Sequence, residues 1–251
     1  LVKGRRFQRF DRTAANVQAL MLFLAVAALV MPAVFELVEG TGLPGPTEEL
    51  RDYDSTVEHL SLAVAIVLLA CYALGLLFSL RTHRDVFNPD YEHGDDTWGW
   101  SIRSSVIALA VAGVAVGVMS EILVGSIEAA SESIGLSEFF IGVIVVAIVG
   151  NAAEHWVAVL VAIKDKMDLS VNIAIGSSSQ IALFVAPVLV ITSFFLGPGP
   201  LPLVFNGFEL AGVILAVLVA YAVTSEGEST WFEGVQLLAL YAILGLTFFV
   251  A

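Results

Sequence analysis

Long apolar stretches alternate with short polar breaks along most of the chain. A helix needs about 20 predominantly apolar residues to cross the hydrocarbon core of a bilayer. The breaks are rich in residues that end helices, as in "EGTGLPGPTEELRDYDS" and "LGPGPLP". The pattern therefore predicts an all-α, multi-pass membrane protein with seven transmembrane helices, at residues 15–38, 57–80, 101–127, 138–163, 170–196, 203–224 and 232–251.

The basic residues fix an orientation for these segments. Cytoplasmic loops carry an excess of Lys and Arg. If the seven segments alternate in direction, only Arg51 lies on the opposite side from the other lysines and arginines, which are Lys3, Arg5, Arg6, Arg9, Arg12, Arg81, Arg84, Arg103, Lys164 and Lys166. We therefore expect residues 1–14 and 81–100 to be cytoplasmic, and residues 39–56 and the C-terminus to be external.

Composition supports a membrane protein and excludes some partners. The chain is 58% hydrophobic and only 14% charged, whereas soluble domains average about 25% charged residues. Its formal net charge of -13 argues against nucleic acid, because phosphate binding needs basic patches. The single cysteine, Cys71, rules out a disulfide within the chain.

The first residues, "LVKGRRFQRFDRTAAN", contain no signal-peptide pattern. They are typical of a cytoplasmic loop between two membrane segments, so we expect the chain to be a fragment. A second cytoplasmic stretch, residues 81–100, is acidic over residues 85–96 and contains the run "NPDYEHGDDT". A solvated linker is the favoured interpretation. A calcium-sensing segment is the alternative, although the run lacks the carboxylate spacing of an EF-hand.

The motif "GNAAEH" places polar residues deep in the fourth segment. Asn151, Glu154 and His155 stand at i, i+3 and i+4, so they share one helical face. Ionisable groups inside a membrane are costly and usually mark an ion path. An interhelical hydrogen bond could explain Asn151 alone, but it explains the three residues together poorly. Gly150, just ahead, allows the backbone to bend or open where it lines a cavity.

The fifth segment contains a second polar motif, "IGSSSQIALFVAP". Ser177 and Gln180 share a face at i, i+3, and they follow Gly176. Serines in membrane helices often bond only to a carbonyl of their own helix. Three serines and a glutamine after a glycine instead favour a functional site.

The third segment combines a helix-packing motif with a carboxylate that lies inside the membrane segment. Gly113 and Gly117 form a GxxxG pattern, which is typical of close-packing or sliding helix faces. Glu121 lies deeper than the segment ends and could line a hydrated path. A paired or snorkelling structural carboxylate is an equally good interpretation.

These residues supply oxygen ligands for a hard cation. The candidate metal ligands are the Glu154 carboxylate, the amide carbonyls of Asn151 and Gln180, and the Ser177 hydroxyl. Calcium takes about 6–8 oxygens in flexible geometry, whereas magnesium holds its water more tightly. The sequence contains no HExxH zinc motif and no GxSxG nucleophile elbow. It therefore favours a transporter over an intramembrane enzyme, while a non-transporting assembly subunit remains a rival.

The two polar motifs together resemble the second signature repeat of the calcium/proton exchangers, within the cation/calcium exchanger superfamily. "FDRTAANVQALMLFLAVAALVMPAVFE" and "SEILVGSIE" resemble flanking regions of that family. The resemblance implies an eleven-helix inverted-repeat fold, of which this chain would be the last seven helices. Residues 1–80 would end the first repeat, residues 81–100 would form the cytoplasmic acidic linker, and residues 101–251 would be the second five-helix repeat.

The resemblance implies a secondary transporter that exchanges Ca²⁺ for H⁺ and needs no cofactor. In the family, one glutamate from each repeat forms the central calcium site, and Glu154 matches the second-repeat ligand. Calcium and protons would compete for this glutamate, because a ligand must shed its proton to bind a metal. Proton coupling is expected to involve Glu154, His155 and Glu121.

Other possibilities stay open at this point. The chain could be a sodium/calcium-type exchanger, or a transporter half that needs the first, N-terminal repeat as its partner. A prokaryotic plasma membrane is the favoured location and a vacuolar membrane the alternative. Assembly into a homo-oligomer is also left open.

Overall fold

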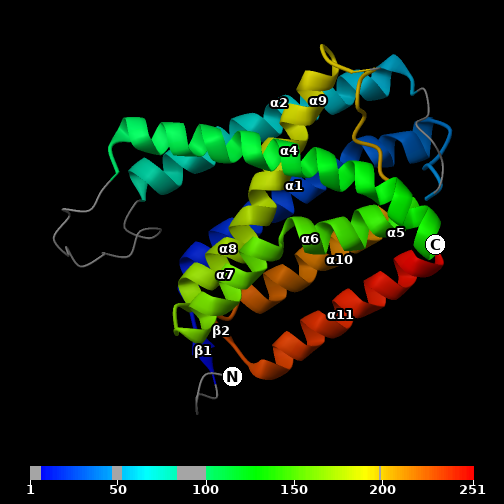
Figure 1. Ribbon diagram of the computed structural model, residues 1–251. Coiled ribbons are helices and arrows are strands. Elements are labelled where there is room, and N and C mark those ends of the chain that lie inside the picture. Colours follow the sequence, from blue (N-terminus) through cyan, green and yellow to red (C-terminus); the bar gives the residue numbers. More distant parts are fainter. Residues whose placement is uncertain (1–6, 47–52, 84–99, 198) are drawn as a thin grey trace.

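The computed structural model describes residues 7–46, 53–83, 100–197 and 199–251, and they form a helical bundle (Figure 1). A single pair of two-residue strands, β1 (Gln8–Arg9) and β2 (Glu228–Ser229), accompanies the helices of the described part. The helical elements are α1 (Arg12–Glu39), α2 (Ser55–Leu77), η1 (Phe78–Thr82), α4 (Ile102–Ile134), α5 (Glu138–Phe140), η2 (Ile141–Val146), α6 (Ala147–Gly150), α7 (Ala152–Ile163), α8 (Met167–Gln180), η3 (Ile181–Val185), α9 (Ala186–Ser193), α10 (Gly207–Thr224) and α11 (Trp231–Val250).

The predicted membrane segments are confirmed. Six helices of the described residues are long and apolar enough to cross a membrane, and a bent pair makes up to seven. The bent pair joins Ile141–Gly150 to Ala152–Ile163 at an angle of 53°, which is the bend expected next to Gly150. Of the predicted acidic linker, residues 81–100, residues 84–99 lie outside the described residues.

Two predicted boundaries differ from the structure by more than three residues. Helix α4 continues beyond the predicted residue 127 to Ile134. Helix α10 begins at Gly207 rather than at residue 203, because Asn206 forms a capping box with Glu209. In a capping box the side chain before the helix bonds to a free backbone N–H of the first turn, and the helix therefore starts there.

The two ends of the bundle agree with the alternating topology. At one end, β1 pairs antiparallel with β2, and Arg9 forms a 3.6 Å salt bridge with Glu228. The Asp11 backbone N–H donates to the Asp168 carboxylate at the same end. Figure 1 shows β1 and β2 together beside the start of α1, with the C-terminus at the far end of α11. The assignment of the β1–β2 end to the cytoplasm stays a prediction.

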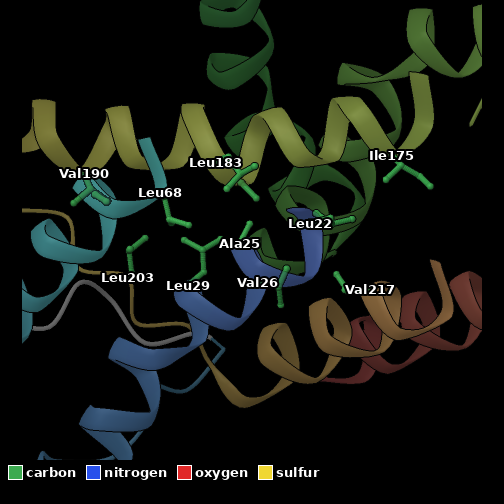
Figure 2. Packing of buried hydrophobic residues seen from close by; sticks show 12 residues of the cluster. Leu22, Ala25, Val26, Leu29, Leu68, Ile175, Leu183, Val190, Leu203 and Val217 are labelled. Atoms are coloured by element: carbon green, nitrogen blue, oxygen red, sulfur yellow. The ribbon is translucent and has the colours of Figure 1, made fainter. Parts of the chain in front are cut away.

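Helix α1 lies at the centre of the packing and contacts α2, α8 and α10. Its buried face consists largely of alanines, including Ala15, Ala19, Ala25 and Ala33. Small residues allow helices to approach closely in a membrane, where packing rather than water exclusion drives association. Figure 2 shows the resulting apolar cluster, to which α1 contributes Leu22, Val26 and Leu29, and its neighbours contribute Leu68, Ile175, Leu183, Val190, Leu203 and Val217.

Capping also fixes the start of α2. The Thr56 backbone N–H donates to Asp54 Oδ1 at 2.7 Å, and this hydrogen bond lowers the pKa of the Asp54 carboxyl below its ordinary value. The cap therefore stabilises the helix start above the carboxyl's unfolded-state pKa, and this stabilisation is lost as the pH falls through the lower folded-state value.

A buried hydroxyl joins α2 to the segment before α10. Ser61 is fully buried, and its oxygen accepts a 3.0 Å hydrogen bond from the Leu203 backbone N–H. Replacing Ser61 with Ala leaves this N–H unpaired, so we expect the free energy of unfolding to fall by about 1–3 kcal/mol. Thermal unfolding of the detergent-solubilised protein measures the change.

The matched control for this prediction is Thr192→Val. The Thr192 hydroxyl donates 2.8 Å to the Val188 carbonyl of its own helix, so its loss leaves no backbone N–H without an acceptor. An equal loss of stability in both variants would contradict the importance of the Ser61–Leu203 bond.

Candidate functional site

The bend in the fourth membrane segment is centred on Asn151. The Asn151 backbone leaves helical geometry, with φ -101° and ψ 9°. Its side-chain amide donates 2.9 Å to the Ala147 carbonyl, while its own carbonyl accepts 2.9 Å from the His155 N–H. Asn151 is therefore the residue at which α6 ends and α7 begins.

This bend places Glu154 in the first turn of α7. The first backbone N–H groups of a helix lack intrahelical partners, and the helix dipole makes this end positive. A carboxylate is favoured at this position. The break thus gives Glu154 a local electrostatic reason to lie in the middle of an apolar segment.

The Ser177 hydroxyl of α8 donates a 2.6 Å hydrogen bond to Glu154 Oε2. A hydroxyl that donates its hydrogen retains oxygen lone pairs that can bind a cation. Further along the same helix pair, the Ser170 hydroxyl donates 2.9 Å to the Ala158 carbonyl. Helices α7 and α8 are therefore joined side by side through two serines of α8 that lie seven residues apart.

The other predicted site residues are not joined to this pair. His155 and Glu121 are exposed, Glu121 on α4. No hydrogen bond or ion pair of the described residues links either of them to Glu154. Gln180 is exposed too, and it lines a cavity of about 270 Å³ between α1, α2 and α8. The structure thus brings together Glu154 and Ser177, with Asn151 three residues before Glu154 at the bend.

The site has one carboxylate within this part of the protein. Among the described residues, no group of three or more His, Cys, Asp or Glu side chains is placed to hold a metal ion. Helix α7 has no buried residue, and the most apolar stretch of α4 has none either. Glu154 and Ser177 therefore make an open partial site rather than an enclosed one.

Sequence analysis misses two polar features that the structure shows. Gln18 of α1 donates its side-chain amide to Asn172 of α8. Glu36, near the end of α1, is buried and accepts hydrogen bonds from the Thr41 N–H at 2.9 Å and the Thr41 hydroxyl at 3.0 Å. The sequence shows the same feature at Gln18 and at Glu36, which is a long polar side chain inside an otherwise apolar run.

Known proteins match almost the whole chain. Residues 104–250 match the family described as "Sodium/calcium exchanger protein". A Ca²⁺/H⁺ antiporter of Synechocystis sp. (strain ATCC 27184 / PCC 6803 / Kazusa) is 42% identical over 96% of this chain and 66% of its own length. The vacuolar calcium ion transporter of Schizosaccharomyces pombe is 37% identical over 98% of this chain and 58% of its own length.

The fold matches as well as the sequence does. The solved structure of native YfkE superposes with a TM-score of 0.74 at 36% identity, covering 100% of this chain and 68% of that one. The chain thus spans about two thirds or less of the length of these relatives. On this agreement in sequence and fold, the chain is an integral multi-pass membrane protein that belongs to the Ca²⁺/H⁺ antiporter family of the cation/calcium exchanger superfamily.

Proposed function

We propose that this protein exchanges Ca²⁺ for H⁺ across a membrane and that Glu154 binds both ions in turn. The observation that carries the proposal is the Glu154–Ser177 hydrogen bond at the start of α7, where the membrane helix bends. Broken helices in transporters expose helix ends and carbonyls to ions near the bilayer midplane. The names of the Synechocystis and Schizosaccharomyces relatives support Ca²⁺ as the cation.

The ligand set suits a hard cation. Glu154 supplies a charged oxygen and Ser177 a neutral one. The side-chain carbonyls of Asn151 and Gln180 join them when the ion is bound, after a change of side-chain conformation. Calcium takes about 6–8 oxygens, so these ligands fill only part of its shell. The exposure of Glu154 at membrane depth leaves room for the remaining ligands, and the first signature repeat of the family supplies them.

Competition for one carboxylate couples the two ions. A carboxylate binds calcium only after it loses its proton. Calcium binding therefore releases H⁺, and protonation releases Ca²⁺. Movement of α4 past the bent pair alternates the access to the site. Gly113 and Gly117 of α4 have open space beside them, and this leaves the helix a smooth face for such movement.

The test of this function is Ca²⁺ uptake by vesicles that contain the full-length protein. An imposed pH gradient should drive the uptake, and a protonophore should abolish it. A sodium/calcium-type exchanger is the second candidate, favoured by the description of the matching family. It would instead need a sodium gradient at equal pH on both sides. Uptake driven by sodium alone would therefore replace the first proposal with the second.

His155 is proposed to take part in proton coupling, together with Glu121. His155 follows Glu154 directly in α7, and histidine is the side chain that changes charge near neutral pH. Replacing His155 with Ala should shift the pH dependence of uptake while changing the maximal rate little. Uptake measured from pH 6 to pH 9 in the same vesicles gives both quantities.

The matched control is His59→Ala. His59 lies near the opposite end of the bundle, where its ring nitrogen contacts the Ser55 carbonyl of its own helix. Its loss should leave the pH profile in place. An unchanged profile in the His155 variant would remove this residue from the coupling mechanism.

The relatives do not point to one particular cellular membrane for this protein. Both bacterial and vacuolar exchangers are among them. We favour a prokaryotic plasma membrane, with the β1–β2 end of the bundle in the cytoplasm as the basic residues predict. Fractionation of the host's membranes tests this placement.

A further inference from the structure

Helix α8 carries two separate polar faces. Asn172, Gly176 and Ser179 follow one another at spacings of four and three residues and therefore share one side of the helix. Ser177 lies about 130° away around the helix, given 3.6 residues per turn. The Ser177 side meets α7 and Glu154, whereas the other side meets α1.

On the α1 side, polar contacts centre on Gln18. Its side-chain amide donates to the Asn172 side-chain carbonyl. The Ser179 hydroxyl donates 3.4 Å to the Gln18 backbone carbonyl. Gly176 lies between these two contacts, and a Cβ there would stand 3.6 Å from Gln18 Oε1. Gly176 therefore faces the Gln18 side chain at van der Waals distance.

A cavity interrupts the apolar packing of α8 against α1 and α2 at this level. The cavity of about 270 Å³ between α1, α2 and α8 is lined by Gln18, Asn172, Gly176 and Ser179. Gln18 Oε1 is buried and has no hydrogen-bond partner among the described residues. The hydrogen bond to Asn172 is therefore what links the Gln18 side chain to α8. The side chains that line this open cavity lack contacts across it, so this part of the α1–α8 interface resists rotation or sliding of α8 less than a fully packed interface would.

We propose that Gln18 and Asn172 position α8 so that Ser177 meets Glu154. They are positioning residues, because they act on the cation site through the opposite face of the same helix. A 2.6 Å hydrogen bond such as Ser177–Glu154 tolerates little displacement. A small rotation of α8 about its axis would therefore break it. The proposal rests on the proposed function for its transport readout.

Replacing Gln18 with Leu removes the amide and keeps a side chain of similar bulk, one bond shorter. An interhelical hydrogen bond in a membrane is worth about 0.6 kcal/mol on average and at most about 1.7 kcal/mol. We therefore expect the Ca²⁺ concentration for half-maximal uptake to rise by about 3- to 15-fold. The maximal rate should change little, because Glu154 and Ser177 remain. Uptake by vesicles containing the full-length protein measures both.

A swap distinguishes positioning from a general loss of folding. The double variant Gln18→Asn, Asn172→Gln keeps one long and one short amide facing each other, and it should restore the half-maximal concentration. Ser178→Ala is the matched control on the same turn of α8, because the Ser178 hydroxyl donates 3.0 Å only within its own helix, to the Ala174 carbonyl. A Gln18→Leu variant that behaves like Ser178→Ala would overturn the proposal.

A second readout does not depend on transport. In a Cys71→Ala background, Glu154→Cys and Ser177→Cys place two thiols at the α7–α8 contact, where a short bifunctional methanethiosulfonate can join them. Adding Gln18→Leu should slow this cross-linking several-fold. An unchanged rate would overturn the proposal even if the wild-type protein moved no Ca²⁺. Failure of wild-type uptake would instead count against the proposed function alone.

Discussion

Replacing Glu154 with Gln is expected to abolish Ca²⁺ uptake driven by a pH gradient. The amide keeps the size of the side chain, and it can still accept the 2.6 Å hydrogen bond from Ser177. It cannot lose a proton, however, and it brings no charge to the cation. Both halves of the exchange cycle therefore fail: the site neither attracts Ca²⁺ strongly nor exchanges it for H⁺.

The expected effect is large because Glu154 is a charged ligand. Losing a group that only supports a metal ligand already costs about 10–100-fold in affinity or activity. We expect the loss of the ligand itself to exceed this range and to bring uptake to the background of empty vesicles. Uptake of ⁴⁵Ca²⁺ over a range of Ca²⁺ concentrations measures it, and calorimetric Ca²⁺ titration of the purified full-length protein separates binding from transport.

Glu233→Gln is a closely matched control. Glu233 also lies in the first turn of a helix, α11, where it forms a capping box with Thr230. Glutamine can take the same capping role, so this variant should fold and transport normally. Transport retained by the Glu154 variant would show that the ion binds elsewhere, and transport lost in both variants would point to misfolding.

The sequence predicts the membrane segments well because the cause is local. Lipid thickness sets the length of a spanning helix, and turn-forming residues end it. The bend is predicted for the same reason: Gly150 weakens the helix where it stands. The start of α10 is predicted less well, since apolar residues precede the helix at Leu203 and the capping side chain of Asn206 decides the boundary.

The candidate site is predicted only in part, because which helix lies beside each face is a tertiary property. The spacing of Ser177 and Gln180 predicts one shared face, but Ser177 meets Glu154 while Gln180 lines the cavity beside α1 and α2. At 100° per residue, Gln180 stands about 60° from Ser177, which is enough to face a different neighbour. The period of a helix gives angles between residues and not the positions of the other helices.

The hydrogen-bond partner of Gln18 is likewise not predictable from the local sequence. Its partner Asn172 lies 154 residues further along the chain. Nothing near Gln18 in sequence indicates whether it faces lipid, water or α8. A polar residue in a membrane helix predicts a partner, whereas the identity of that partner depends on how α1 and α8 pack.

Replacing Ser177 with Ala is expected to raise the Ca²⁺ concentration for half-maximal uptake by about 10-fold. This is the lower end of the cost of losing a group that supports a metal ligand. The variant removes one oxygen from the cation site and the hydrogen bond that orients Glu154. Ser177→Thr keeps the hydroxyl and should retain most of the affinity. Vesicle uptake at a series of Ca²⁺ concentrations measures each variant under the same pH gradient.

Comparison with two neighbouring residues makes this prediction specific to Ser177. Ser178→Ala should leave the affinity unchanged, because that hydroxyl bonds within α8. Gln180→Ala should weaken transport as well, because the proposed site includes the Gln180 amide after it turns from the cavity toward the ion. Wild-type affinity in the Ser177→Ala variant would contradict the cation site as proposed. A Gln180→Ala variant with wild-type affinity would remove Gln180 from the proposed ligands and leave Ser177 as the ligand from α8.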